Sequence, residues 1–186
     1  TVAAEIRGDL AQPHPMQRLL QGDVGSGKTI VAALAALQAI ENECQVAVMA
    51  PTEILAQQHF FNFRRLLRNT PYNVAFLSGS ATAREKKNIK KLLVAGLVHI
   101  VVGTHALVEE NVQFKALGLV IIDEQHRFGV MQRAMLRQKG EVPDTLIMTA
   151  TPIPRTLALT VYGDLDVSII DQMPPGRKPI ETILKR

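Results

Sequence analysis

The sequence predicts an α/β domain with a mostly parallel central sheet and helices on both faces. Three observations support this fold class. Short apolar runs alternate with longer stretches of helical periodicity, and a glycine-rich loop at residues 22–29 lies between the first run and a helix. The apolar runs are continuous rather than alternating, as in strands that are covered on both faces. Strands that are separated by helices are joined by right-handed crossovers, which make a sheet parallel.

In the first part of the chain, helices are indicated by apolar residues at every third or fourth position and strands by short apolar runs. Pro13 and Pro15 end the first helix, Pro51 ends a strand, and Thr52 can cap the helix that follows. The predicted elements are a helix at Thr1–Gln12 with Ala3, Ile6 and Leu10 on one face, a strand at Arg18–Gln21, a helix at Thr29–Ile40, a strand at Val46–Ala50, a helix after Thr52 with Leu55, His59, Phe63, Leu66 and Leu67 on its inner face, and a strand at Val74–Leu77.

The rest of the chain begins with a basic amphipathic helix, predicted at Ala81–Ala95. We interpret its charges as a solvated outer face, with a nucleic-acid contact as the alternative. After Tyr162 the pattern weakens: residues 163–166 resemble a turn and residues 174–179 a linker. The basic residues are Arg84, Lys86, Lys87, Lys90 and Lys91, the apolar side is Ile89, Leu92 and Leu93, and the predicted strands are Val98–Val102, Leu119–Asp123 and Leu146–Met148.

Composition narrows the class of protein. Hydrophobic residues make up 47% of the 186 residues, which is enough for a sizeable core, and the net charge of +4 permits nucleic-acid binding without requiring it. Cys44 is the only cysteine, which excludes an internal disulfide and a cysteine-based metal site and fits a reducing compartment. The most apolar stretch, Ile30–Ile40, is too short to cross a bilayer. Because the chain starts at Thr1 and ends soon after a new apolar stretch begins, we expect a fragment of a longer protein.

The glycine-rich loop fits the P-loop template G-x-x-x-x-G-K-[ST] at every position. Its glycines let consecutive N–H groups point inward at a phosphate chain. Lys28 would bind the β- and γ-phosphates, and the Thr29 hydroxyl can be a ligand of Mg²⁺. The alternative is a glycine-rich turn with a surface lysine. The predicted phosphate-binding residues are Gly22, Asp23, Val24, Gly25, Ser26, Gly27, Lys28 and Thr29.

A second motif, the acidic pair Asp123–Glu124, lies at the end of the predicted strand Leu119–Asp123. A strand that ends in two carboxylates fits a Walker B motif, in which Asp123 would hold Mg²⁺ and Glu124 would orient the attacking water. The carboxyl ends of parallel strands face one crevice, so Thr29 and Asp123 can converge on one ion. Gln125 and His126 come next, either as polar residues at a helix start or as sensors of the γ-phosphate.

Together these motifs resemble superfamily 2 helicases. Further segments match in order: Ala50–Glu53 resembles motif Ia, Gly103–His105 motif Ib, and Thr149–Thr151 motif III. Longer stretches are similar to the RecG family of bacterial branched-DNA helicases. The transcription–repair coupling factor shares much of this pattern but usually has Glu at the position of Gln125, and PriA is a more distant relative. The stretches similar to RecG are Gln21–Thr29, Gly103–Leu107, Asp123–Val130, Met148–Leu157 and Tyr162–Ser168.

The resemblance implies a RecA-like P-loop NTPase lobe. Residues 1–172 would form the first lobe of a two-lobed ATP-dependent DNA helicase, and residues 173–186 a linker and the start of the second lobe, which carries the arginine finger. It implies ATP and Mg²⁺ as cofactors and a bacterial cytoplasmic location. Its partners would be branched or forked DNA, held through the phosphate backbone, and the second lobe and N-terminal wedge domain of the same parent chain.

The resemblance also implies roles for individual residues. Lys28, Asp123 and Glu124 would be catalytic, with Gln125 and His126 linking the γ-phosphate to motif III. The coupling residues of motif III would be Thr149 and Thr151, and the residues on the DNA face Pro51, Thr52, Gly103 and Thr104. Turn and capping chemistry at strand ends is the alternative for those four, most strongly for Thr52.

Other classes of P-loop protein remain as rivals. A GTPase switch reads guanine with an Asn-Lys-x-Asp segment, which this sequence lacks. A metabolic P-loop kinase would phosphorylate a small acceptor. The intact Asp123–Glu124 pair argues against an inert binding module.

Overall fold

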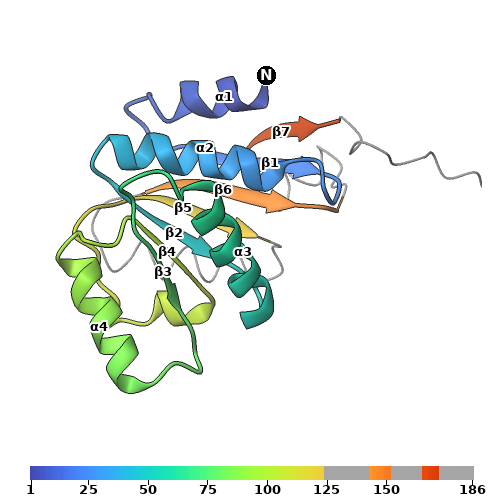
Figure 1. The fold of residues 1–186 in the computed structure, drawn as a ribbon. Helices are drawn as coiled ribbons and strands as arrows, with labels where there is room; N and C mark the ends of the chain where they lie inside the picture. The colour runs from blue at the N-terminus through green and yellow to red at the C-terminus, as the bar shows by residue number, and fades with distance from the viewer. Residues whose placement is uncertain (124–142, 152–164, 172–186) are drawn as a thin grey trace, which may run out of the picture.

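The computed structural model describes residues 1–123, 143–151 and 165–171, and its centre is a sheet of seven strands (Figure 1). All the strand pairs are parallel, and the order across the sheet is β3-β4-β2-β5-β6-β1-β7. The predicted parallel α/β fold is therefore confirmed. The strands are β1 (Gln17–Gly22), β2 (Gln45–Met49), β3 (Val74–Leu77), β4 (Ile100–Gly103), β5 (Leu117–Asp123), β6 (Asp144–Thr149) and β7 (Asp166–Ile170).

Helices cover both faces of the sheet (Figure 1). The first three helices pack with one core cluster, whereas the fourth helix and the 3-10 turn pack with another cluster on the opposite face. The helices are α1 (Val2–Asp9), α2 (Lys28–Glu41), α3 (Glu53–Leu66) and α4 (Ala83–Val94), and the 3-10 turn is η1 (His105–Val108).

Successive residues of the central strands face the two cores in turn. In β2, Val46 and Val48 pack with the first cluster, whereas Ala47 and Met49 pack with the second, and all four are buried. This arrangement explains the continuous apolar runs in the sequence, because a strand with helices on both faces has no solvent-facing side.

Threonine side chains cap the starts of α3 and α4. The Thr52 side chain accepts a hydrogen bond from the Leu55 backbone N–H at 3.3 Å, as predicted. Thr82 and Glu85 form a reciprocal capping box at the start of α4, so that this helix begins at Ala83 rather than at the predicted Ala81, and it ends at Val94, one residue earlier than predicted. The hydrogen bonds from Thr82 to the Glu85 carboxylate lower the pKa of that group.

Two predictions were wrong, one about packing and one about secondary structure. Leu66 is exposed rather than on the inner face of α3, because Leu67, four residues after Phe63, occupies the buried position. Asp166 begins strand β7 rather than belonging to a turn. The sequence pattern missed β7 because this strand pairs with β1 alone among the described strands and has a single buried residue, the polar Ser168. Gly163 and Asp164, the start of the predicted turn, lie outside the described residues.

At the edge of the sheet where the strands begin, side-chain hydrogen bonds connect neighbouring elements. Gln45 is buried, and its side chain donates to the Leu93 and Val98 carbonyl oxygens and accepts from the Lys115 and Ala116 N–H groups. No signal in the sequence distinguished this glutamine from an ordinary polar residue beside a strand.

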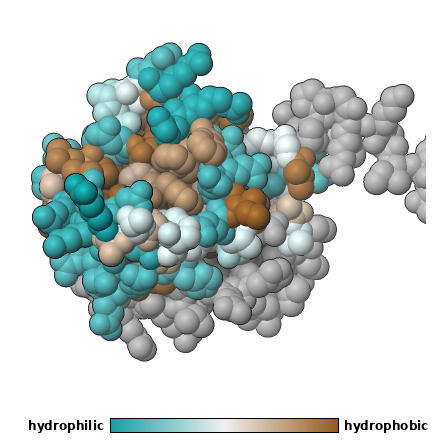
Figure 2. All heavy atoms as spheres, turned by 60° about the horizontal axis from the view of Figure 1, so that its bottom comes forward, coloured by the Kyte–Doolittle hydropathy of each residue, from teal (hydrophilic) through white to brown (hydrophobic). Residues whose placement is uncertain are grey.

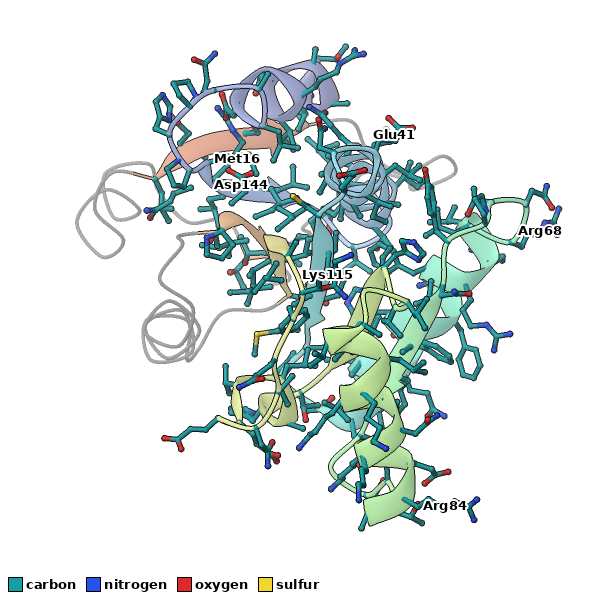
Figure 3. The ribbon with its side chains drawn as sticks, turned by 90° about the vertical axis from the view of Figure 1, so that its left-hand side faces the viewer. Met16, Glu41, Arg68, Arg84, Lys115 and Asp144 are labelled. Carbon is teal, nitrogen blue, oxygen red and sulfur yellow. The ribbon has the colours of Figure 1, made fainter. Side chains whose placement is uncertain are left out.

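Two further polar residues, Asp144 and Arg18, form contacts at this edge. The Asp144 carboxylate accepts a hydrogen bond from the Met16 N–H at 2.6 Å, and Figure 3, which looks at this edge, shows the two residues side by side. Arg18 lies in β1 and is 8% exposed; it forms an ion pair with Asp9 at 2.5 Å and donates to the Ser168 hydroxyl at 2.7 Å. These bonds tie α1, β1 and β7 together.

Hydrophobic patches alternate with hydrophilic side chains on the face of the molecule drawn in Figure 2. In the part of the chain that the structure describes, none of the helices has the length and apolar character needed to span a membrane. On α4, Arg84, Lys87 and Lys91 are exposed, which agrees with the interpretation of a solvated outer face. Cys44 is partly buried against the core between α2 and β2.

Candidate nucleotide-binding site

Three neighbouring strands bring the predicted nucleotide-binding motifs to one edge of the sheet. In the register of β5 and β6, Asp123 lies beside Met148, and in that of β6 and β1, Thr149 lies beside Gln21. The phosphate loop leaves β1 directly after Gln21, so its start is two strand spacings, roughly 10 Å, from Asp123. The two motifs therefore share the edge at which the strands end.

Backbone geometry accounts for all three glycines of the loop. Gly27 caps α2 with a φ of 98°, and Gly25 has a φ of 82°; both lie in the left-handed region that favours glycine. Gly22 has a different reason: a Cβ added there would lie 2.5 Å from the Ser26 Oγ and 3.1 Å from the Ile170 Cβ. The loop can thus turn back tightly over the end of β1 only without these side chains.

Some polar side-chain groups in or next to the loop form hydrogen bonds to the chain, and others are buried without a partner among the described residues. Lys28 Nζ donates to the carbonyl oxygens of Gly22 at 2.6 Å and Asp23 at 2.8 Å. The Oγ of Ser26 and the Oε1 of Gln21 are buried and make no hydrogen bond to the described part of the chain. Because buried polar atoms nearly always have a partner, these two atoms point to a ligand at this edge.

Asp123 has a partner that sequence analysis missed. Its Oδ2 lies 2.6 Å from the Nε2 of His59, which is on the inner face of α3. The Asp123 side chain is 16% exposed and the His59 side chain 9%. The helical spacing had placed His59 on the inner face, but only the adjacency of β2 and β5 in the sheet shows which residue it meets.

The motif III threonines bond to each other. The hydroxyls of Thr149 and Thr151 are 2.8 Å apart, and the Thr151 N–H donates to the Thr149 Oγ1 at 3.1 Å. Thr149 ends β6, between the phosphate loop and Asp123. Three predicted site residues, Glu124, Gln125 and His126, lie outside the described residues, so their predicted roles stay predictions.

The four residues predicted for the DNA face also lie at the carboxyl edge, over the other half of the sheet. Met49 pairs with Gly103 in the register of β2 and β4, so Pro51 and Thr52 lie near Gly103 and Thr104. A Cβ on Gly103 would lie 2.5 Å from the Leu77 carbonyl oxygen, which leaves no room for a side chain. The Thr52 hydroxyl caps α3, so the capping alternative accounts for one of its bonds.

Comparisons with known proteins agree with this arrangement. The sequence pattern of the DEAD/DEAH box helicase family matches residues 9–160. The ATP-dependent DNA helicase RecG of Aquifex aeolicus is 59% identical over 182 residues, which cover 97% of this chain and 23% of that protein. The RecG of Haemophilus influenzae is also 59% identical, over 187 residues that cover 98% of this chain and 27% of that protein.

A solved structure of RecG bound to a three-way DNA junction has the same fold. It aligns with a TM-score of 0.83 and 53% identity, over 96% of this chain and 24% of that one. The chain thus spans about a quarter of the length of the curated relatives it matches. The RecA-like fold and the resemblance to RecG are confirmed, and these relatives do not favour the transcription–repair coupling factor. The chain belongs to the DEAD/DEAH box helicase family and is similar over nearly its whole length to RecG helicases.

Proposed function

We propose that this chain is the first, ATP-binding motor lobe of a RecG-type helicase that remodels branched DNA. The observation that carries the proposal is the shared edge of the sheet, at which the loop of residues 22–29 and Asp123 end neighbouring strands. The relatives named RecG support the choice of DNA helicase over a nucleotide switch or a small-molecule kinase. A bacterial cytoplasmic location is part of the proposal.

The loop fits a triphosphate chain. Gly22 and Gly27 allow the tight turn, and the N-terminus of α2 directs backbone N–H groups and the positive end of the helix dipole at the same point. Lys28 already lies over the loop, and the Ser26 hydroxyl is an orphan donor at its side. We therefore assign phosphate binding to Gly22, Asp23, Val24, Gly25, Ser26, Gly27, Lys28 and Thr29.

Mg²⁺ fits the donor set at this edge. Thr29 lies in the first turn of α2 and Asp123 ends β5, and both offer hard oxygen ligands. Mg²⁺ at a nucleotide site is usually held by one or two protein groups together with phosphate oxygens and water. Bound Mg–ATP would supply the phosphoryl bond whose hydrolysis drives the motor.

The remaining proposed roles concern residues that follow the strands. Glu124 would orient or deprotonate the attacking water, and Gln125 and His126 would link the γ-phosphate to Thr149 and Thr151. The mutual hydrogen bond of the two threonines supports a coupled pair at the end of β6.

The DNA face is proposed for Pro51, Thr52, Gly103 and Thr104. Backbone groups and hydroxyls at strand ends can hold phosphates without reading bases. The proposed partners are branched or forked DNA, a second RecA-like lobe and an N-terminal wedge domain. Residues 1–172 would form this lobe, and residues 173–186 the linker and the beginning of the second lobe.

A nucleotide titration tests the proposal. The chain should bind a fluorescent ATP analogue in a Mg²⁺-dependent way, and unlabelled ATP should displace it more readily than GTP. The Lys28→Ala variant should bind the analogue much more weakly, whereas Lys87→Ala, which removes an exposed lysine of α4, should not. A clear preference for GTP would exclude the motor assignment.

A turnover measurement tests the two-lobe part of the proposal. This chain alone should hydrolyse ATP very slowly, because the proposal places the arginine finger on the second lobe and such a finger raises the rate on the order of a thousandfold. The full-length helicase should be stimulated by branched DNA. Rapid, DNA-stimulated turnover by the 186-residue chain would contradict the assignment.

A further inference from the structure

We propose that His59 is a positioning residue for the metal site: it fixes the carboxylate of Asp123 in the orientation that Mg²⁺ requires. The inference rests on the proposed function, because it takes Asp123 to be the residue that holds the ion. His59 itself touches neither nucleotide nor metal in this proposal. It acts through the 2.6 Å contact between its Nε2 and the Asp123 Oδ2.

The contact joins two elements that are distant in the sequence. Asp123 is the last residue of β5, where a strand no longer holds the side chain between neighbours on both sides. His59 lies roughly two turns into α3, which packs on the same sheet. The bond engages one carboxylate oxygen and leaves the other able to face the cation.

The surroundings of His59 argue that it is not there for stability alone. Its side chain is 9% exposed, and its neighbours on the inner face of α3 are Ala56 and Phe63. The Nδ1 is buried without a hydrogen-bond partner in the residues described. A leucine would fill similar space without leaving a buried polar atom unsatisfied, which is unfavourable for folding. What histidine adds at this position is the bond to Asp123.

Metal sites commonly depend on such an outer contact. Groups that hold a ligating side chain by a hydrogen bond set its direction, and their removal typically weakens metal binding about 10- to 100-fold. A carboxylate that can rotate freely would reach the same ion less often. The nucleotide itself, in contrast, would be held by the loop of residues 22–29 and should not depend on His59.

The test measures metal binding rather than turnover. In the full-length helicase, Mn²⁺ binding in the presence of ADP is followed by electron paramagnetic resonance, and a fluorescent ADP analogue is titrated with and without Mg²⁺. His59→Leu should raise the Mn²⁺ concentration for half-saturation about tenfold or more. Nucleotide affinity without Mg²⁺ should stay unchanged. His59→Gln, which keeps an N–H donor at the position of Nε2, should restore most of the affinity for Mn²⁺.

Control variants separate this effect from loss of packing. Phe63→Leu alters the same buried face of α3 one turn later and should lower the melting temperature without changing Mn²⁺ affinity. If His59→Leu does not fold, the comparison passes to His59→Asn and His59→Gln, since asparagine is too short to reach Asp123. Equal Mn²⁺ affinity in the two members of that pair, or in His59→Leu and the unmodified protein, overturns the inference.

One more variant tells the failure of this inference from the failure of the proposed function. Asp123→Asn should weaken Mn²⁺ binding at least as much as His59→Leu. If Asp123→Asn weakens it and His59→Leu does not, His59 is a packing residue and the metal assignment stands. If Asp123→Asn leaves Mn²⁺ binding unchanged, the metal assignment itself is wrong, and the positioning role falls with it.

Discussion

The two edges of the sheet treat their polar groups in opposite ways. At the edge where the strands begin, Arg18, Gln45 and Asp144 each have their bonding atoms engaged by other parts of the same chain. At the edge where the strands end, the side-chain oxygen atoms of Ser26 and Gln21 are buried, and the described residues leave them unsatisfied. The polar groups at the first edge stabilise the fold, whereas some of those at the second edge remain available to bind a ligand.

This difference predicts which measurement each edge controls. Substitutions of Arg18 and Gln45 at the first edge should lower the free energy of unfolding and leave nucleotide affinity unchanged. Substitutions at the second should do the reverse, because groups that serve a ligand contribute little to the fold. Any variant that changes both quantities strongly would break the comparison.

The largest effect on stability is expected from Arg18→Met. The substitution leaves Asp9 and the Ser168 hydroxyl without their buried partner Arg18. Breaking such a pair should cost about 3 kcal/mol, the low end of the usual range. The cost stays at the low end because Glu5 and Asp166, the other carboxylates near Arg18, are exposed enough to be solvated. Urea unfolding followed by circular dichroism measures it. Glu5→Gln, at the exposed rim of the same network, should cost less than about 1 kcal/mol. Equal losses in the two variants would show that the network is not centred on Arg18.

Gln45→Leu should come next, with a loss of about 2 kcal/mol in the free energy of unfolding. The side chain keeps its size, but the Leu93 and Val98 carbonyls and the Lys115 and Ala116 N–H groups lose a partner. The exposed Gln57→Leu on α3 is the matched control and should change stability by less than about 0.5 kcal/mol. Nucleotide affinity should be the same in both; a drop confined to Gln45→Leu would mean that the two edges are coupled.

Lys28→Ala should weaken nucleotide binding by roughly ten- to a hundredfold, the contribution of hydrogen bonds to a charged group. It should lower the free energy of unfolding by less than about 1 kcal/mol, because the Lys28 side chain is not buried in the core and its bond to the Asp23 carbonyl oxygen is exposed. A fluorescent-nucleotide titration and a urea melt on the same sample measure both. Unchanged affinity would refute the phosphate assignment.

The smallest effect is a pH dependence at Asp144. Burial raises the pKa of this carboxyl above its ordinary value of 3.8, although the Met16 N–H partly offsets the rise. Between the unfolded and the folded pKa, the folded state holds a proton that the unfolded state has released, so the free energy of unfolding falls as pH rises through that window.

Asp144→Asn should flatten this fall, since an amide oxygen can still accept from Met16 and does not ionise. Urea melts from pH 3.5 upward measure the slope. Glu110→Gln at an exposed carboxylate is the control and should leave the slope unchanged. A steeper slope in Asp144→Asn would reverse the assigned direction of the shift.

Local patterns were enough to predict most of the fold. The loop of residues 22–29 and the strand ending at Asp123 have their signals within a few consecutive residues, and parallel strands then had to end at the same edge. Strand β7 was missed because its residues show no continuous apolar run and it becomes a strand only by pairing with β1. The His59–Asp123 contact was missed for a similar reason: it depends on β5 lying beside β2, and strand order is not written in either segment.

The two carbonyl bonds of Lys28 have a consequence for the speed and strength of nucleotide capture. They tether the loop at Gly22 and Asp23. When phosphate binds, Lys28 would exchange the carbonyl oxygens for phosphate oxygens. Little conformational entropy would be lost, because the loop of residues 22–29 is already held in place. Nucleotide affinity would then depend on how well the phosphate oxygens compete with these two peptide carbonyl oxygens for the Lys28 ammonium group.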